Sequence, residues 1–162
     1  PWGFLCLMLF GFGWARPVPV NVSNFKNRRA GDAVTALAGP VSNFLLAFLS
    51  FFLMTMLGVK LPLQSNFEVI LLRFLWYLGA LSTGLGVFNL IPVHPLDGSH
   101  VLNALLPFDV QRRWNNFIAR YQSIILLVVI FVLWRGSLGV LISGAQSGLL
   151  ALAQRAAYLL LA

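Results

Sequence analysis

Long apolar runs alternate along the chain with short polar segments, and their lengths predict helices that cross a membrane. Residues 33–57, 69–91 and 117–134 each match the roughly 20 apolar residues that span a hydrocarbon core about 30 Å thick. Asp32 precedes the first run and is suited to cap a helix, while Gly58 is suited to end it. The pattern therefore predicts three firm transmembrane helices, with shorter amphipathic helices between and around them.

The segment nearest the start of the chain has a different pattern. Within residues 2–22, Pro17 and Pro19 forbid a regular helix, and valines alternate with other residues in a way that suits an extended edge strand. We predict a short extended, β-like segment associated with the membrane. An ordinary interfacial loop anchored by Trp14 is the equal alternative.

The rest of the predicted architecture is helical. Residues 99–106 and 110–120 have the spacing of short amphipathic helices, and the weakly apolar, Gly-, Ser- and Ala-rich end predicts an interfacial helix or a short last span. The fold class predicted is an all-α polytopic membrane protein. We divide it into a transmembrane core over residues 1–135 and a C-terminal helical tail over residues 136–162.

The composition of the chain is typical of a protein that lies in a lipid bilayer. Hydrophobic residues make up 59% of the 162 residues and charged residues 9%, which is too little polar surface to cover a water-soluble globule. The net charge of +7 comes from eleven scattered Lys and Arg residues, without the dense basic stripe that nucleic acid requires. Anionic lipid headgroups are the better counter-charge, and the single Cys6 excludes an intrachain disulfide or a CxxC metal pair.

Basic residues in the connecting segments predict the orientation. Residues 13–32 contain four Lys or Arg and residues 92–116 contain two, whereas residues 58–68 contain one. Because short positively charged loops tend to stay in the cytoplasm, we expect the first two segments to be cytoplasmic. Asp97 then lies on the cytoplasmic side of an integral, multi-pass membrane protein.

Asp97 is the most informative residue of the chain. It is one of four acidic residues and closes the segment 89–98, which reads Asn-Leu-Ile-Pro-Val-His-Pro-Leu-Asp-Gly. A carboxylate near membrane depth is costly unless a basic side chain, a metal ion or water compensates it. Pro92 and Pro95 interrupt the helix and Gly98 permits a sharp exit, so the acid is held at a broken helix end.

An alternative reading makes Asp97 a simple cap for the helix that follows, because Asp is favoured at that position. A cap explains the aspartate but not the two flanking prolines and Asn89 together. The rival functional class is a non-enzymatic polytopic protein, a transporter-like protein or a scaffold, in which the acid pairs with Arg or with a solute. No inverted repeat joins the three predicted spans, which counts against a transporter.

A second unusual feature lies inside the first predicted span, where residues 38–43 read Ala-Gly-Pro-Val-Ser-Asn. Pro40 cannot donate a helical hydrogen bond, and Gly39 allows another backbone to approach. Asn43 lies one turn further along. It is interpreted either as hydrogen-bonding glue between helices or as a contact to substrate or to a catalytic helix.

These motifs together resemble the site-2 protease family of intramembrane zinc metalloproteases, peptidase family M50. The segment 89–98 is similar to that family's Asn-Pro-Asp-Gly region, with its LDG core at residues 96–98. The Ala-Gly-Pro-x-x-Asn pattern at 38–43 and the Gly-Trp-Ala-Arg-Pro-Val-Pro-Val loop at 13–20 are similar in order and spacing. The resemblance covers residues 11–106.

The resemblance implies hydrolysis of a peptide bond in a transmembrane protein substrate. In such enzymes a His-Glu-x-x-His pair on an upstream helix supplies two zinc ligands and a catalytic glutamate, and the aspartate matching Asp97 is the third ligand. Three protein ligands leave a fourth position for water, whose pKa zinc lowers towards about 7. By the same resemblance Asn89 orients the substrate or the site, Pro95 shapes the turn that presents Asp97, and Asn43 packs the core helices or contacts substrate.

This chain departs from the family pattern because it contains no His-Glu-x-x-His. Its two histidines, His94 and His100, are six residues apart with no glutamate between them. The zinc site is therefore incomplete within these residues, no catalytic residue is assigned, and we expect residues 1–162 to be inactive alone. The start at Pro1, inside an apolar run, favours truncation of a larger protein over a degenerate homologue.

The two histidines receive structural interpretations. Pro95 opposes a helical turn that would join His94 to Asp97 at a metal, so His94 is interpreted as a hydrogen-bonded or exposed loop residue. His100 is interpreted as structural, and a contact to Asp97 is the alternative. Substrate identity and oligomeric state leave no readable pattern in the sequence.

Overall fold

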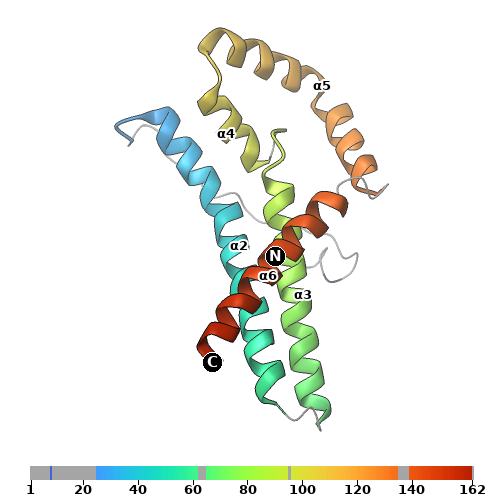
Figure 1. The fold of residues 1–162 in the computed structure, drawn as a ribbon. Helices are drawn as coiled ribbons and strands as arrows, with labels where there is room; N and C mark the ends of the chain where they lie inside the picture. Colours follow the sequence, from blue (N-terminus) through green and yellow to red (C-terminus); the bar gives the residue numbers. More distant parts are fainter. Residues whose placement is uncertain (1–7, 9–24, 62–64, 95, 135–138, 162) are drawn as a thin grey trace.

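The computed structural model describes residues 8, 25–61, 65–94, 96–134 and 139–161, and this part of the chain is helical without strands. The predicted all-α class is confirmed, whereas the predicted β-like segment at residues 2–22 lies outside the described residues, apart from residue 8. Figure 1 shows the elements, which are α2 (Arg28–Lys60), α3 (Asn66–Asn89), α4 (Asp97–Leu105), α5 (Phe108–Trp134) and α6 (Gly139–Leu161).

Helix α2 begins earlier than the apolar run predicts. Asn27 is its N-cap, and the Asn27 side chain accepts a hydrogen bond of 3.2 Å from the backbone N–H of Ala30. Asp32, which we expected to be the cap, lies in the second turn of the helix instead. With 33 residues, α2 is about 50 Å long, so its first turns extend well beyond a hydrocarbon core of about 30 Å.

Helix α3 starts with two reciprocal hydrogen bonds that the local sequence dictates. The backbone N–H of Glu68 donates to Ser65 Oγ over 3.3 Å, and the N–H of Ser65 donates to the Glu68 carboxylate over 3.1 Å. This capping box satisfies two N–H groups that a helix start otherwise leaves free. The predicted second span, residues 69–91, coincides with this helix to within a few residues.

Helices α2 and α3 pack closely because glycines on α3 face aromatic side chains on α2. A Cβ at Gly79 would lie 2.5 Å from the ring of the fully buried Phe51, and one at Gly86 would lie 2.9 Å from the ring of Phe44. The Phe51 ring also contacts Trp76 at a centroid distance of 5.6 Å. Small residues opposite large ones let two backbones approach, which is the common form of helix packing in membranes.

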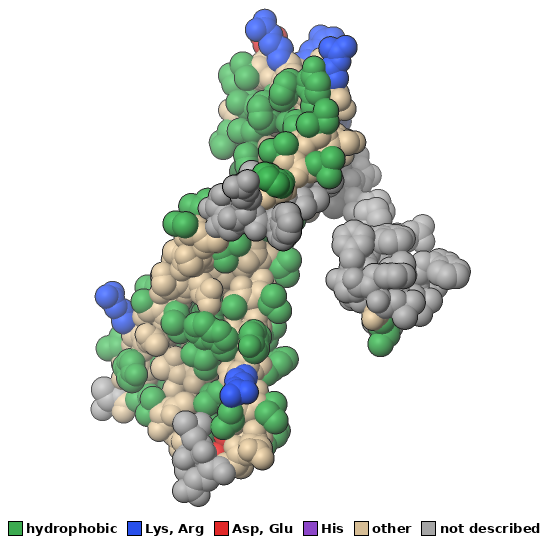
Figure 2. Space-filling model, turned by 90° about the vertical axis from the view of Figure 1, so that its right-hand side faces the viewer, with side chains coloured by type: hydrophobic (Ala, Val, Ile, Leu, Met, Phe, Trp, Pro, Cys, Tyr) green, Lys and Arg blue, Asp and Glu red, His purple; other side chains and the backbone are tan. Residues whose placement is uncertain are grey.

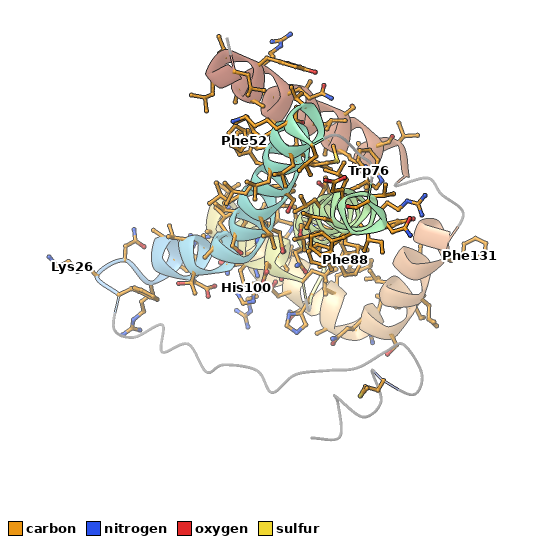
Figure 3. The ribbon with its side chains drawn as sticks, turned by 90° about the horizontal axis from the view of Figure 1, so that it is seen from below. Lys26, Phe52, Trp76, Phe88, His100 and Phe131 are labelled. Carbon is orange, nitrogen blue, oxygen red and sulfur yellow. The ribbon has the colours of Figure 1, made fainter. Side chains whose placement is uncertain are left out.

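Helix α6 lies against the same pair. Ala47 and Phe51 of α2 form a buried cluster with Ala153 of α6, and Figure 3 shows Phe52 on the side of α2 that faces α6. The expected C-terminal helix is therefore present and packs on the α2 and α3 pair. The division into a core and a tail stays a prediction.

Helix α5 differs from the prediction. The expected amphipathic helix at 110–120 and the expected span at 117–134 form one continuous helix, which arches over the upper end of the molecule in Figure 1. Within the described residues two helices, α2 and α3, are long and apolar enough to cross a membrane. The predicted count of three firm spans is therefore corrected to two for the part of the chain that the structure describes.

The outer surfaces of α2 and α3 are apolar. Of the most apolar 18-residue window in each helix, 22% is buried in α2 and 28% in α3, and the rest is half-buried or exposed. Figure 2 shows hydrophobic side chains along the molecule and a gathering of Lys and Arg at its upper end. An extended apolar surface of this kind is typical of a region that contacts lipid or another protein.

Candidate metal centre

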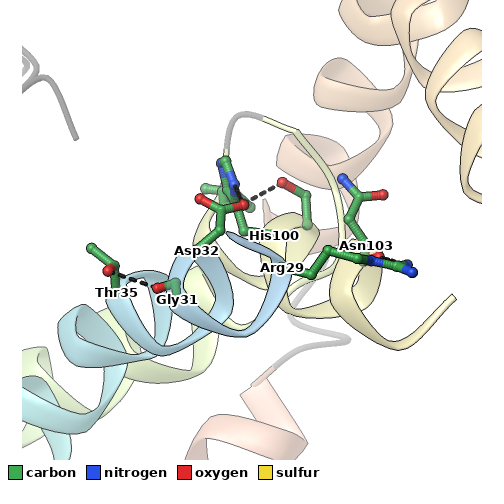
Figure 4. Close-up of polar contacts among 8 residues, drawn as sticks. Arg29, Gly31, Asp32, Thr35, His100 and Asn103 are labelled. Carbon is green, nitrogen blue, oxygen red and sulfur yellow. Dashed lines mark hydrogen bonds and ion pairs between the residues drawn. The ribbon is translucent and has the colours of Figure 1, made fainter. Parts of the chain in front are cut away.

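The site is built where α4 runs back along the first half of α2. Asp97, His100 and Asn103 follow one another at three-residue spacing on α4, so they share one face of that helix. They meet Gly39, Asp32 and Arg29 of α2 in that order, which makes the two helices antiparallel here. Figure 4 shows the upper part of this contact, with Asp32 beside His100 and Arg29 beside Asn103.

The carboxylate of Asp97 lies against the backbone of Gly39. A Cβ at Gly39 would stand 2.8 Å from Asp97 Oδ2, so the missing side chain of the glycine makes room for the acid. Asp97 is half-buried, and no hydrogen bond or ion pair from another described residue reaches its carboxylate. Two motifs that are distant in the sequence thus meet at a carboxylate whose oxygens are free to bind a further group.

The simple-cap alternative for Asp97 is wrong. Leu96 occupies the N-cap position of α4 and no side chain makes a capping hydrogen bond there. Asp97 is the first residue of the helix, where its negative charge still interacts favourably with the positive end of the helix dipole. The capping role that would explain the aspartate is absent from this helix start.

Gly98 explains how the chain can turn so sharply before α4. A Cβ at Gly98 would lie 2.6 Å from the carbonyl oxygen of Ile91 and nearer still to that of Leu90. The segment is tightened by hydrogen bonds of 2.8 Å from the N–H of Val93 to the Ile91 carbonyl and from the N–H of Leu96 to the Val93 carbonyl. The end of α3 and the start of α4 therefore touch through their backbones, and any side chain at Gly98 would collide with them.

The other predicted site residues lie around this point at different depths. Asn89 is the last residue of α3 and Asn43 lies one turn beyond Gly39 on α2; both are half-buried. Pro92 is exposed, and Pro95 lies outside the described residues. The structure therefore brings Asp97 and Gly98 against the helices that carry Asn43 and Asn89, and within the described residues no hydrogen bond joins either amide to Asp97 or Gly98.

The histidines have separate environments. His94 is exposed, as expected of a loop residue. His100 Nδ1 lies 2.8 Å from Asp32 Oδ2, so its partner is Asp32 and not Asp97. This pairing supports the structural interpretation of His100, and no hydrogen bond between His100 and Asp97 is present among the described residues.

In the sequence, Arg29 was counted only as one of the basic residues of the connecting segment 13–32. Its Nη2 donates a 2.7 Å hydrogen bond to the backbone carbonyl of Asn103, a second to the carbonyl of Leu106, and a third of 3.3 Å to the Gln111 side chain. Its guanidinium also stands 4.5 Å from the centre of the Phe108 ring. The signal available in the sequence was the spacing of Arg29, Asp32 and Gly39, which places them near one face of a helix.

The donor chemistry of Asp97 fits a zinc ion as one ligand. Zinc binds carboxylate oxygens at protein sites, and the oxygens of Asp97 are free of other partners in the described part of the chain. The described residues contain no group of three or more His, Cys, Asp or Glu side chains placed to hold a metal ion. A zinc ion at Asp97 would therefore need further ligands.

The chain is similar to a known protein family and to a named relative. The model of the family described as peptidase family M50 matches residues 18–134. A protein of Bacillus subtilis (strain 168), named "Putative zinc metalloprotease YwhC", is 36% identical over 138 residues, which are 85% of this chain and 62% of the relative. The chain thus spans about three fifths of that relative's length. No solved structure matches the chain.

Proposed function

This chain belongs to peptidase family M50, and we propose that it supplies the aspartate ligand of a zinc endopeptidase that cleaves membrane-spanning or membrane-associated proteins. The observation that carries the proposal is the meeting of Asp97 with Gly39, because it places a free carboxylate between the two matched motifs. The name of the Bacillus relative, a zinc metalloprotease, supports the choice of metal.

Each residue near Asp97 has a role in this proposal. Asp97 holds the metal through a carboxylate oxygen, and Gly39 keeps the space that the carboxylate fills. Asn43 and Asn89 offer amide groups that can hydrogen-bond to the backbone of an extended substrate. Zinc, when bound with its other ligands, supplies a polarised water and stabilises the negative charge that develops on the attacked carbonyl oxygen.

The 162 residues are proposed to be inactive on their own. A single carboxylate does not make a zinc site, which takes three protein ligands in catalytic centres. The two remaining ligands and the general base are proposed to come from a His-Glu-x-x-His helix outside these residues. The apolar outer surfaces of α2 and α3 are proposed to face lipid.

We propose that α2 and α3 cross the membrane and that the Asp97 end faces the cytoplasm. The starts of α2 and α5 lie at the same end of the molecule in Figure 1, and together they carry Arg28, Arg29, Arg112 and Arg113. The opposite end, between α2 and α3, carries Lys60 and the acidic Glu68. Positive charge at short connecting segments favours the cytoplasmic side.

The transporter-like or scaffold alternative expects Asp97 to pair with an arginine or a solute. Among the residues described here, Arg29 is the arginine that contacts α4, and it binds backbone carbonyls at the far end of that helix. Asp97 therefore has no basic partner there, and this arrangement favours the metal proposal over the pairing that the alternative needs.

The proposal is tested on the full-length protein that contains this segment, reconstituted in vesicles with a membrane-spanning substrate. Removal of zinc with a chelator is expected to stop cleavage, and adding back a stoichiometric amount of zinc is expected to restore it. Cleavage is followed by gel electrophoresis and mass spectrometry of the products. Cleavage that continues unchanged in the zinc-free protein would contradict the proposal.

Gly39→Ala is expected to weaken zinc binding with little loss of stability. The added Cβ would stand 2.8 Å from Asp97 Oδ2, and the carboxylate, as the end of a flexible side chain, gives way more readily than a helix backbone. Zinc affinity is measured by competition with a chromophoric chelator, and stability by thermal unfolding. Gly58→Ala on the same helix is the control, because its Cβ would meet Leu72 at an ordinary 4.0 Å. Equal zinc affinities for both variants would show that Gly39 is not a cradle for Asp97.

A further inference from the structure

We propose that Arg29, Asp32 and His100 are positioning residues that set the register of α4 on α2 and thereby hold Asp97 against Gly39. These three residues are called the clasp. The inference rests on the proposed function, in which Asp97 is a zinc ligand. The contacts of the clasp lie outside the zinc site itself.

Helix α4 needs an external anchor because it is short. It has nine residues, and isolated helices of that length are not stable in water. Its fully buried residues are the small Gly98 and Ser99, and the larger Val101 and Leu102 are partly buried. Polar contacts to α2 add directional constraints that this apolar packing does not supply.

The middle contact of the clasp joins Asp32 and His100. Their side chains meet at 2.8 Å between Asp32 Oδ2 and His100 Nδ1, although they are 68 residues apart in the chain. The exposed fractions of the His100 and Asp32 side chains are 42% and 32%, so the pair adds little to stability through charge attraction in water. Its effect is geometric, because His100 stands one turn from Asp97 and Asp32 stands two turns from Gly39.

The upper contact of the clasp is made by Arg29. Its guanidinium donates to the carbonyl of Asn103, in the last turn of α4, and to that of Leu106, the C-cap of the helix. Carbonyls at a helix end lack partners within the helix. Figure 4 shows Arg29 reaching from α2 to this end of α4. The two contacts lie at different positions along α4, so together they oppose both sliding and rotation of α4 relative to α2. A single contact would leave α4 free to rotate about it.

The reason that register matters is the tolerance of a metal site. A ligand must be held to within about 0.5 Å of its productive position, and a shift of α4 by one residue moves Asp97 by about 1.5 Å. Loss of groups that orient a metal ligand typically weakens metal binding 10- to 100-fold. Because the clasp acts through the helix and not on Asp97 directly, we expect an effect of about 10-fold.

The experiment measures the zinc dissociation constant of the full-length protein by competition with a chromophoric chelator. His100→Leu, which keeps the volume and removes the ring nitrogen, is expected to weaken zinc binding about 10-fold. His100→Asn is expected to restore most of the affinity, because its amide nitrogen can occupy the place of Nδ1. His94→Leu is the matched control: His94 also lies three residues from Asp97, but it is exposed.

One further variant and a measurement of stability separate the outcomes. Asp97→Asn tests the proposed function: if it leaves zinc affinity unchanged, Asp97 is not a ligand and the proposed function fails. If Asp97→Asn weakens binding but His100→Leu and His94→Leu bind zinc alike, the clasp is overturned and the proposed function stands. Thermal unfolding of the zinc-free variants identifies a role in stability alone, since loss of stability with unchanged zinc affinity also overturns the clasp.

If His100→Leu does not fold, the exchanged pair Asp32→His with His100→Asp decides the question. The exchange keeps an acid opposite a histidine across the same gap, so zinc affinity near that of the unchanged protein supports the clasp. Zinc affinity that stays low in a folded exchanged pair, or an exchanged pair that also fails to fold, overturns it.

Discussion

Asp97→Asn in the full-length protein is expected to weaken zinc binding by more than about 100-fold and to stop peptide cleavage. The amide has the size of the carboxylate but lacks its charge, so it is a much poorer partner for zinc. Losing a ligand itself should exceed the 10- to 100-fold effect of losing a group that only orients one. Zinc content by mass spectrometry, zinc affinity by chelator competition and the cleavage rate measure the effect.

The fold is expected to survive this change. The Asp97 carboxylate makes no hydrogen bond to another residue of the described ranges, so an amide of equal size breaks no known contact. Asp109→Asn is the control, because Asp109 is an exposed acid in the first turn of α5 and no hydrogen bond or ion pair joins its carboxylate to another described residue. Similar zinc affinity in Asp97→Asn and Asp109→Asn would remove the basis for placing the metal at Asp97.

Gly98→Ala is expected to destabilise the protein by about 3 kcal/mol or more, at the upper end of the range for overpacked sites. The new Cβ would collide with the carbonyls of Leu90 and Ile91, and backbone atoms cannot swing aside as a side chain can. The return of the chain from α3 to α4 should open, which also moves Asp97 from Gly39. Equilibrium unfolding in detergent measures the stability, and limited proteolysis detects opening of the segment between α3 and α4.

Gly84→Ala is the matched control for this prediction. Gly84 lies within α3, and a Cβ there would meet no atom within 4 Å. Alanine is favoured over glycine inside a helix by up to about 1 kcal/mol, so the control is expected to be neutral or slightly stabilising. A Gly98→Ala protein as stable as Gly84→Ala would mean that the close backbone contact at Gly98 is wrong.

Much of the fold was predictable because helices that face lipid are encoded by the length of apolar runs. Helix α3 lies within a few residues of its predicted span. The start of α2 was missed because the run of apolar residues begins at residue 33, whereas the cap that starts the helix is the polar Asn27. The continuity of α5 was missed because its polar and apolar halves have different patterns but share one helix.

The candidate site was predictable in part. Asp97 and Gly98 were singled out because prolines and an acid at the end of an apolar run contradict ordinary helix chemistry. Gly39 was predicted to allow another backbone to approach, but the group that approaches it is a carboxylate from α4. His100 and Asp32 could not be paired from the sequence, because neither residue's local pattern indicates a partner 68 residues away.

The sequence by itself determined the helical class, two apolar helices suited to a membrane, and the order of motifs that resembles peptidase family M50. These properties are local: they depend on runs of apolar residues, on prolines and on short patterns. The tertiary structure alone decided that α4 folds back along α2, so that Asp97 meets Gly39 and His100 meets Asp32. The physical reason is that close packing depends on the fit of side chains and backbones from distant segments, and a local pattern carries no information about which distant surface will provide that fit.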